Sequence, residues 1–211
     1  TLPPVRESTG SEAYVGGATA IVADFSTVLT DAMPLFLSVV VGLGFIMLLI
    51  LFRSAVVSLT AVVTSLLSFA ASTGITVEVF QWGWLKDLGF AQISSIDSTV
   101  PPLVLAMTFG LSMDYEVFLI ARIREFWLTS GRTRADNDES VALGLARTGR
   151  VITAAALIMS ISFGALIAAQ VSFMRMFGLG LTLAVLIDAT LVRMVLLPAF
   201  MRLMGRWNWW A

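Results

Sequence analysis

Three consecutive residues, Asp114, Tyr115 and Glu116, place two carboxyl groups and a phenol inside an apolar run from Pro101 to Ala121. A carboxylate near the middle of a bilayer costs roughly 2.5–3.5 kcal/mol on insertion-based scales. Such a group is tolerated where it faces a wet cavity, finds a partner or takes up a proton. Asp114 with Tyr115 therefore indicates a protonation site in a membrane transporter.

Small residues accompany the intramembrane aspartates at helical spacing. Two apolar segments each place two small residues and an aspartate at every fourth position: Ala106, Gly110 and Asp114 in one, and Gly180, Ala184 and Asp188 in the other. Residues four apart share one face of a helix, and small side chains let neighbouring helices approach closely. We therefore expect both stripes to point into a helix bundle.

Each of the other polar groups leaves two interpretations open. Glu116 is either solvated near an interface or part of a relay, and Asp188 is either structurally paired or part of transport. Asp114 and Tyr115 could also be structural, with their hydrogen bonds satisfied by neighbouring side chains. Arg193 follows Asp188 by five residues, a poor spacing for an ion pair on one helix. We expect it to reach the membrane surface or to pair with an acid from another helix.

Composition identifies the class of protein. Hydrophobic residues make up 58% of the 211 residues and charged residues 13%, whereas soluble domains are about 45–50% apolar. The chain is therefore an all-α integral membrane protein. A net charge of −1 excludes a nucleic-acid footprint. Without Cys or His there is no disulfide, thiolate chemistry or His-ligated metal, and we expect neither metal nor cofactor.

Five segments are long enough to cross a hydrocarbon core of about 30 Å, which needs about 20 apolar residues. They lie near 34–52, 55–77, 101–121, 151–173 and 176–201. The first two are separated by Arg53 and Ser54 alone and should form a tight hairpin. Trp and Phe residues in the 78–100 loop suit the headgroup layer.

The distribution of basic residues predicts the orientation. One side of the five-span model collects nine: Arg53, Arg122, Arg124, Arg132, Arg134, Arg147, Arg150, Arg202 and Arg206. The other side holds Arg6, Lys86 and Arg175. The plasma-membrane protein should therefore have its 122–150 loop and C-terminus in the cytoplasm, and its N-terminal segment and the 78–100 loop outside.

Polar regions flank the predicted spans. Residues 1–33 read as the end of an extracytoplasmic domain and a short lead-in helix, with Pro34 in the first turn of the first span. In the 122–150 loop, Asp138 or Ser140 should cap a helix that begins near Val141. The chain begins at Thr1 with no signal-peptide pattern, and we expect it to be a piece of a longer protein.

Three strings carry a resemblance to a known family. They are Phe109-Gly110-Leu111-Ser112-Met113-Asp114-Tyr115-Glu116-Val117-Phe118-Leu119, then Ala142-Leu143-Gly144-Leu145-Ala146-Arg147-Thr148-Gly149-Arg150-Val151-Ile152-Thr153-Ala154-Ala155-Ala156, then Leu186-Ile187-Asp188-Ala189-Thr190-Leu191-Val192-Arg193. In this order they resemble the C-terminal half of the MmpL transporters, the actinobacterial branch of the resistance-nodulation-division (RND) superfamily. The resemblance covers essentially the whole chain.

The resemblance implies a fold and a mechanism. The spans would be helices eight to twelve of a twelve-helix RND transporter, with residues 1–33 ending its second porter domain. Asp114 and Tyr115 match the family's Asp-Tyr pair on the tenth helix, which relays protons together with a matching pair on the fourth. That fourth helix is not in this chain, so this chain should hold only half of the relay.

The implied function is proton-driven export of lipids, glycolipids or other hydrophobic molecules by a secondary transporter rather than an enzyme. Its partners would be membrane lipids, the hydrophobic substrate and the missing N-terminal half, with a homo-oligomer left open. Two rivals remain. An intramembrane aspartyl protease could use Asp114 and Asp188 as a dyad, although both lack the Gly-x-Gly-Asp motif of such proteases. A lipid-sensing bundle without transport is the other.

Overall fold

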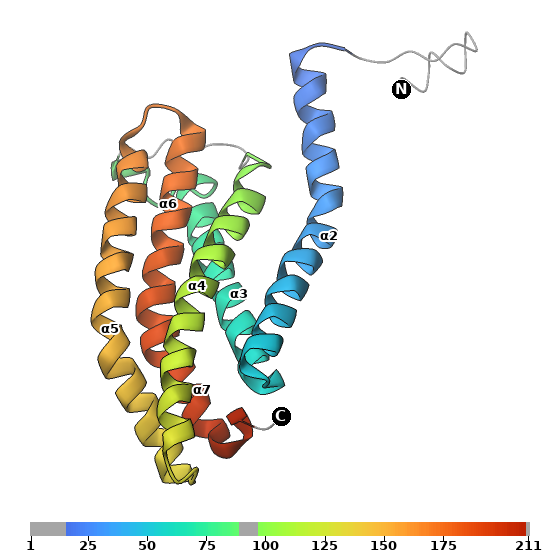
Figure 1. The fold of residues 1–211 in the computed structure, drawn as a ribbon. Helices are drawn as coiled ribbons and strands as arrows, with labels where there is room; N and C mark the ends of the chain where they lie inside the picture. The colour runs from blue at the N-terminus through green and yellow to red at the C-terminus, as the bar shows by residue number, and fades with distance from the viewer. Residues whose placement is uncertain (1–15, 89–96, 210–211) are drawn as a thin grey trace, which may run out of the picture.

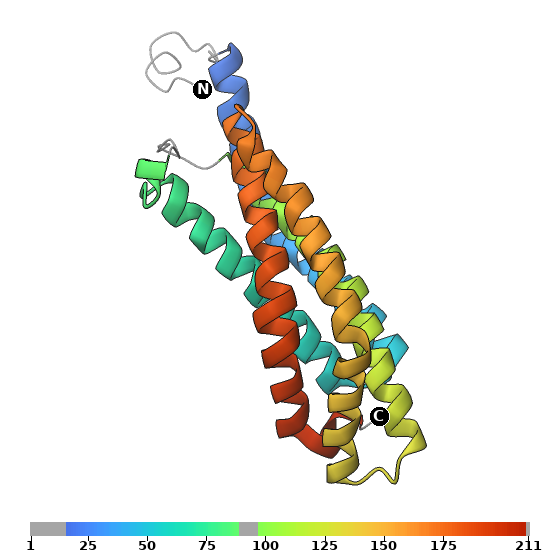
Figure 2. The same ribbon diagram turned by 90° about the vertical axis from the view of Figure 1, so that its left-hand side faces the viewer.

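The computed structural model describes residues 16–88 and 97–209. These residues hold five helices that are long and apolar enough to cross a membrane, which confirms the predicted all-α membrane bundle. Figures 1 and 2 show them as an elongated bundle that is open on one side, where α2 stands away from the other helices at its N-terminal end. The predictions for residues 1–15, and for Phe90 in the aromatic loop, lie outside the described residues.

The first two helices form the predicted hairpin. α2 spans Ala18–Phe52 and α3 spans Ala55–Phe80. Arg53 adopts a left-handed conformation with φ of 51°, and its N–H donates to the Leu49 carbonyl at 2.8 Å. Ser54 then caps α3 by accepting from the Val57 N–H at 3.3 Å. Two residues therefore suffice to close one helix and start the next.

The predicted break at Pro34 is wrong. The lead-in segment and the first span are one helix of 35 residues with Pro34 inside it. A proline inside a helix removes one hydrogen bond, but membrane helices tolerate it because nearby hydroxyls satisfy freed backbone groups. The carbonyl that Pro34 leaves without its helical donor is that of Thr30, an exposed residue. The hydroxyls of Thr30 and Ser38 donate instead to the carbonyls of Ser26 and Pro34.

The predicted cytoplasmic loop is mostly helical. α4 spans Val100–Thr129 and α5 spans Arg134–Gly164, so residues 130–133 alone connect them. The expected helix start near Val141 is also wrong. Thr133 caps α5 instead: its hydroxyl accepts from the Asp136 N–H, and the Asp136 carboxylate accepts from the Thr133 N–H. This reciprocal capping box satisfies two backbone donors, so the helix can begin in polar sequence.

The last span is built from three helical types. A 3-10 turn, Ala165–Ala168, follows α5, and α6 spans Ser172–Ile187. A π-helix, Asp188–Leu196, leads into α7, Leu197–Met204, and a final 3-10 segment, Gly205–Trp209. Earlier in the chain, a short 3-10 turn, Lys86–Leu88, lies between α3 and α4. Trp82 and Trp84 beside it are exposed, whereas Phe80 is buried at the end of α3.

Close packing of α4 against α5 depends on Gly144. A Cβ added there would lie 3.2 Å from the Ile123 Cα and N, and closer still to the Ile123 side chain. The backbone atoms of Ile123 cannot move aside without shifting α4. Gly144 therefore permits the close approach of α4 and α5.

We expect Gly144→Ala to destabilise the full-length protein by about 1–3 kcal/mol, the usual cost of an overpacked core. Gly74→Ala is the matched control, because nothing lies within 4 Å of a Cβ at that exposed helical position. It should be neutral or slightly stabilising, since Ala favours helix over Gly. Unfolding in detergent measures both, and equal midpoints would contradict the packing described for Gly144.

Candidate functional site

The three acidic and phenolic residues of α4 point in different directions. Asp114 is exposed, Tyr115 is half-buried and Glu116 is 2% exposed among the described helices. Successive residues on a helix lie about 100° apart, so one helix presents them to three environments. The interpretation of Glu116 as a solvated carboxylate is therefore wrong.

The small-residue stripe of α4 does not face the described bundle. Ala106, Gly110 and Asp114 are all exposed, and nothing lies within 4 Å of a Cβ added at Gly110. The expectation that this stripe points into the bundle is wrong for the described helices, because α4 turns its opposite face, which carries Ser112 and Glu116, toward them.

The stripe of α6 does face the interior. Ala184 is 0% exposed, and a Cβ on Gly180 would lie 3.3 Å from Val104 of α4 and 3.6 Å from Thr76 of α3. The stripe thus allows α6 to pack closely against α3 and α4, and it places Asp188 between them. Leu181 beside it is also 0% exposed.

Asp188 and Arg193 form a buried ion pair. Arg193 Nη2 donates to Asp188 Oδ2 at 2.5 Å, and the two side chains are 2% and 9% exposed. The expectation that Arg193 reaches the surface or pairs with another helix is wrong. Residues 188–196 form a π-helix, in which hydrogen bonds join residues five apart. That winding brings side chains at i and i+5 to one side, which an α-helix would not do.

Ser112 joins the ion pair to α4. Its hydroxyl donates to Asp188 Oδ1 at 2.9 Å, and its carbonyl accepts from Arg193 Nη2 at 3.0 Å. Ser68 of α3 is a second hydroxyl near the same carboxylate oxygen, at 3.4 Å. The pair is therefore held by three helical elements, and both charges have hydrogen-bond partners. Buried ion pairs need such additional bonds to offset desolvation.

Glu116 lies at the other end of this network without a cation in contact. Its carboxylate oxygens are 3.4 Å from the hydroxyls of Thr64 and Ser65 on α3. Thr64 already donates to backbone carbonyls at 2.8 and 2.9 Å, so it has little left to offer Glu116. Ser65 lies 2.9 Å from Ser112. The chain Glu116–Ser65–Ser112–Asp188 thus links two buried carboxyl groups through two hydroxyls.

Tyr115 borders this network from the other side. Its ring lies 5.3 Å from the Arg193 guanidinium, within the range of a cation–π contact. Its hydroxyl donates to the sulfur of Met159 on α5 at 3.6 Å. A cavity of about 20 Å³ touches Tyr115, Thr108, Asp188 and Arg193, which is room for one water molecule. These polar groups offer the partners that such a water needs.

Sequence reasoning missed the hydroxyl-bearing residues of this site. Thr64, Ser65, Ser68 and Ser112 are at most 3% exposed and make the contacts described above. A signal for the α3 members is present, because its buried Ser and Thr residues recur at helical spacing: Ser58, Ser65, Ser68, Ser72 and Thr76. A stripe of hydroxyls within an apolar helix predicts a polar interior face.

The arrangement can hold and move charge inside a membrane. Exposed Asp114 and buried Glu116 lie on opposite faces of α4, and two hydroxyls link Glu116 to Asp188 of the π-helix. The fixed guanidinium of Arg193 sets the electrostatic potential between them. Such a set of ionisable groups in a membrane helix is characteristic of ion or proton pathways.

Comparison with known proteins gives the family. The model of the MMPL family matches residues 3–211. The chain is 48% identical over 97% of its length to the heme uptake protein MmpL11 of Mycobacterium tuberculosis, covering 21% of that protein. It is 48% identical over 93% of its length to the mycolic acid-containing lipids exporter MmpL11 of Mycolicibacterium smegmatis, covering 20% of it.

A relative with lower identity matches the full length of this chain. The trehalose monomycolate exporter MmpL3 of Mycobacterium tuberculosis is 36% identical over 100% of this chain, which covers 22% of that protein. The chain thus spans about a fifth of the length of these relatives. The family model, the identities and the five membrane-spanning helices together show that the chain belongs to the MMPL family and corresponds to the C-terminal part of an MmpL transporter.

Proposed function

We propose that this chain forms half of the membrane unit of an exporter that is driven by the proton motive force. The observation that carries the proposal is Asp114, which lies in the membrane-crossing helix α4 on a face that the other described helices leave exposed. A carboxylate facing lipid at that depth is strongly disfavoured, so another protein segment must cover it. The missing N-terminal half supplies such a segment.

In this proposal Asp114 carries the transported proton and Tyr115 orients or bridges to it. Protonation from outside neutralises Asp114 and lowers the cost of packing it against the opposite half. Deprotonation toward the cytoplasm restores the charge and resets the helices. Each charge that crosses 100 mV gains about 2.3 kcal/mol, which is enough to shift a conformational equilibrium substantially.

Glu116 supports the relay by holding a second proton. A hydroxyl has one hydrogen, and that of Ser112 is directed at Asp188. The bond between Ser65 and Ser112 then takes the hydrogen of Ser65, which leaves none for Glu116. A protonated Glu116 can donate to Ser65 and completes the chain of donors. We propose that these hydrogen bonds link Glu116 to the Asp188–Arg193 pair.

The exported molecule is proposed to be a lipid, a glycolipid or another hydrophobic compound. Two relatives are a mycolic acid-containing lipids exporter and a trehalose monomycolate exporter, and a third is a heme uptake protein. A cavity of about 460 Å³ between α2 and α4 has almost entirely apolar walls, which suits acyl chains. It is lined by Phe25, Leu29, Ala32, Met33, Phe36, Thr99, Pro102, Leu103 and Ala106.

Neither rival function is favoured by an observation. A catalytic aspartyl dyad needs two carboxyl groups that share a proton, whereas Asp188 is paired with Arg193 and Asp114 lies on the opposite, exposed face of α4.

The direct test of the proposed function reconstitutes the full-length protein in vesicles and measures outward transfer of a labelled lipid under a proton gradient. Transfer that persists after a protonophore collapses the gradient would refute proton coupling. Lipid binding without transfer would favour the sensor, and peptide cleavage the protease.

The proposed orientation places the α4–α5 connection in the cytoplasm. We expect a cysteine at the exposed position Ala135 to react with an impermeant thiol reagent only from the cytoplasmic side. A cysteine at exposed Asp87 should react only from outside. The segment contains no native Cys, so the background comes from the rest of the protein alone and can be removed by substitution. Reaction of both positions from one side would overturn the orientation.

A partner half over the Asp114 face also predicts the behaviour of Gly110. Gly110→Leu should lower the melting temperature and the export rate of the full-length protein, because a large side chain would separate the two halves. Gly74→Leu is the control, since Gly74 is likewise exposed and has nothing within 4 Å of an added Cβ. Equal tolerance at both positions would show that the Gly110 face meets lipid.

A further inference from the structure

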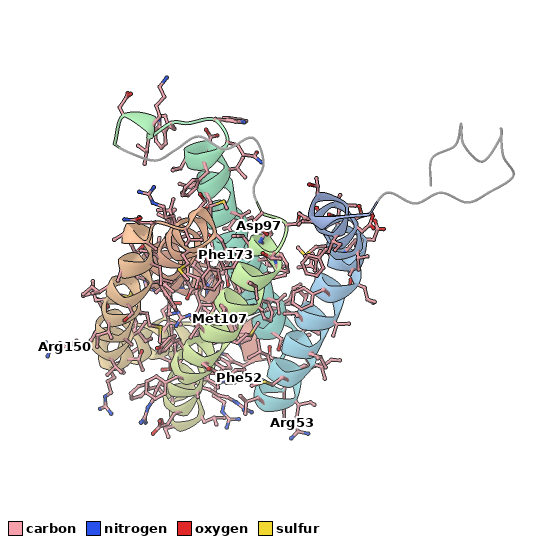
Figure 3. All side chains as sticks on the ribbon, turned by 90° about the horizontal axis from the view of Figure 1, so that it is seen from above. Phe52, Arg53, Asp97, Met107, Arg150 and Phe173 are labelled. Carbon is pink, nitrogen blue, oxygen red and sulfur yellow. The ribbon has the colours of Figure 1, made fainter. Side chains whose placement is uncertain are left out.

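A basic cavity lies at the end of the bundle where α2 and α4 terminate. Its volume is about 610 Å³, and its walls combine four arginines with aromatic and aliphatic residues: Phe52, Arg53, Arg124, Trp127, Leu128, Arg132, Arg206 and Trp209. Figure 3 shows Arg53 at the periphery of the helices, next to Phe52. The four arginines come from three stretches of the chain, which only the fold brings together: the end of α2, the end of α4 with its connection to α5, and the C-terminal 3-10 segment.

The positive charge of this cavity has no ion-pair partner among residues 16–88 and 97–209. No carboxylate lines it, and the described part of the chain gives none of the four arginines an ion-pair partner. Arg124 donates to the Leu51 carbonyl at 3.0 Å, which fixes that side chain near the end of α2. Four unpaired guanidinium groups around one cavity produce a strongly positive potential that attracts anions.

Two stacked tryptophans line the apolar part of the cavity. Trp127 and Trp209 stack with ring centroids 5.7 Å apart, and the Trp209 indole N–H donates to Asn137 at 2.9 Å. The cavity also opens beside apolar surface, because Leu51 and Leu128 are 44% and 52% exposed. A charged pocket next to such a surface matches a molecule with an anionic head and hydrocarbon chains.

We propose that this cavity binds the headgroup of an anionic phospholipid. Guanidinium groups form paired, charge-assisted hydrogen bonds with phosphate oxygens, and basic pockets between membrane helices bind phosphate-bearing headgroups. The acyl chains would lie along the exposed ends of α2 and α4. None of the lining residues belongs to the network around Asp188 or to the Asp114 face, so the site is independent of the proposed proton relay.

The test uses the full-length protein in detergent, titrated with phosphatidylglycerol and with phosphatidylcholine and followed by native mass spectrometry. The pocket variant is Arg53→Gln, Arg132→Gln and Arg206→Gln together, with Arg124 kept because it also contacts backbone. The control variant removes three exposed arginines from outside the cavity, Arg122→Gln, Arg150→Gln and Arg202→Gln. Both variants lose the same net charge.

We expect tight, selective binding of phosphatidylglycerol to the unmodified protein. Each basic residue near an anionic lipid strengthens binding roughly fivefold, so the pocket variant should bind roughly a hundredfold more weakly. The control variant should lose less than tenfold. A photoreactive group on the headgroup should cross-link to peptides that contain Trp127 or Trp209, which also decides the question if the pocket variant folds poorly.

Three results would overturn the proposal. Equal weakening in both variants would mean that net charge alone attracts the lipid. Displacement of the lipid by free glycerol phosphate at similar concentrations would identify a site for small anions. Cross-linking elsewhere, with the cavity unlabelled, would place the lipid on another surface or show that the N-terminal half fills the cavity.

Discussion

Asp114→Asn in the full-length protein should abolish export under a proton gradient while leaving the fold intact. The amide has nearly the shape of the carboxyl group and costs less to bury than a charge, so the halves can still pack. It cannot carry a proton, so the charge state of α4 no longer changes during the cycle. Export into the outer medium, measured with a labelled lipid in vesicles at imposed gradients, gives the rate.

Two neighbouring variants control for this result. Tyr115→Phe removes a hydroxyl that donates to Met159 and should impair transport no more than Asp114→Asn does. Glu116→Gln retains a donor for Ser65 and should be milder than Asp114→Asn. An Asp114→Asn protein that is folded and exports at the unmodified rate would show that Asp114 is structural, and the coupling site would have to lie elsewhere.

Asp188→Asn should be the most destabilising of the conservative changes in the buried network. It leaves the guanidinium of Arg193, which is 2% exposed, without a counter-charge. Removing one partner of a buried ion pair costs about 3–5 kcal/mol. Chemical unfolding of the full-length protein in detergent, compared with the unmodified protein, measures the change.

A double variant separates charge from geometry. Asp188→Asn with Arg193→Gln replaces the ion pair by two amides that can still hydrogen-bond, so most of the lost stability should return. Arg122→Gln is the surface control, because the Arg122–Glu125 pair is 45% and 60% exposed and such pairs contribute at most about 1 kcal/mol. If the double variant were as unstable as Asp188→Asn, the unpaired charge would not be the cause.

The amino-acid sequence alone was sufficient to predict the class and the number of membrane-spanning helices. Hydropathy over about 20 residues is a local property that membrane insertion requires, so the five segments could be read directly. The hairpin at Arg53 and Ser54 was predictable for the same reason, since two residues separate two apolar runs. The position of Asp114 inside the third apolar segment, 101–121, also follows from counting residues.

Helix ends were less predictable where helices leave the membrane. α2 continues through Pro34, and α4 and α5 extend into polar sequence as far as residues 129 and 134. Hydropathy marks where a helix crosses the hydrocarbon, but outside it the helix continues for as long as caps and side chains satisfy its backbone. Those local hydrogen bonds, such as the Thr133–Asp136 box, decide the ends.

Only the tertiary structure decided which residues meet. Asp114 and Asp188 have the same small-residue spacing in the sequence, yet Asp188 is 7% exposed among the described helices whereas the side of α4 that carries Asp114 is exposed. Periodicity fixes which residues share a face of one helix, but it does not say against which neighbour that face packs. The π-helical turn that pairs Asp188 with Arg193 is likewise favoured by packing against α3 and α4, because an ion pair buried there needs the hydroxyl and carbonyl of Ser112.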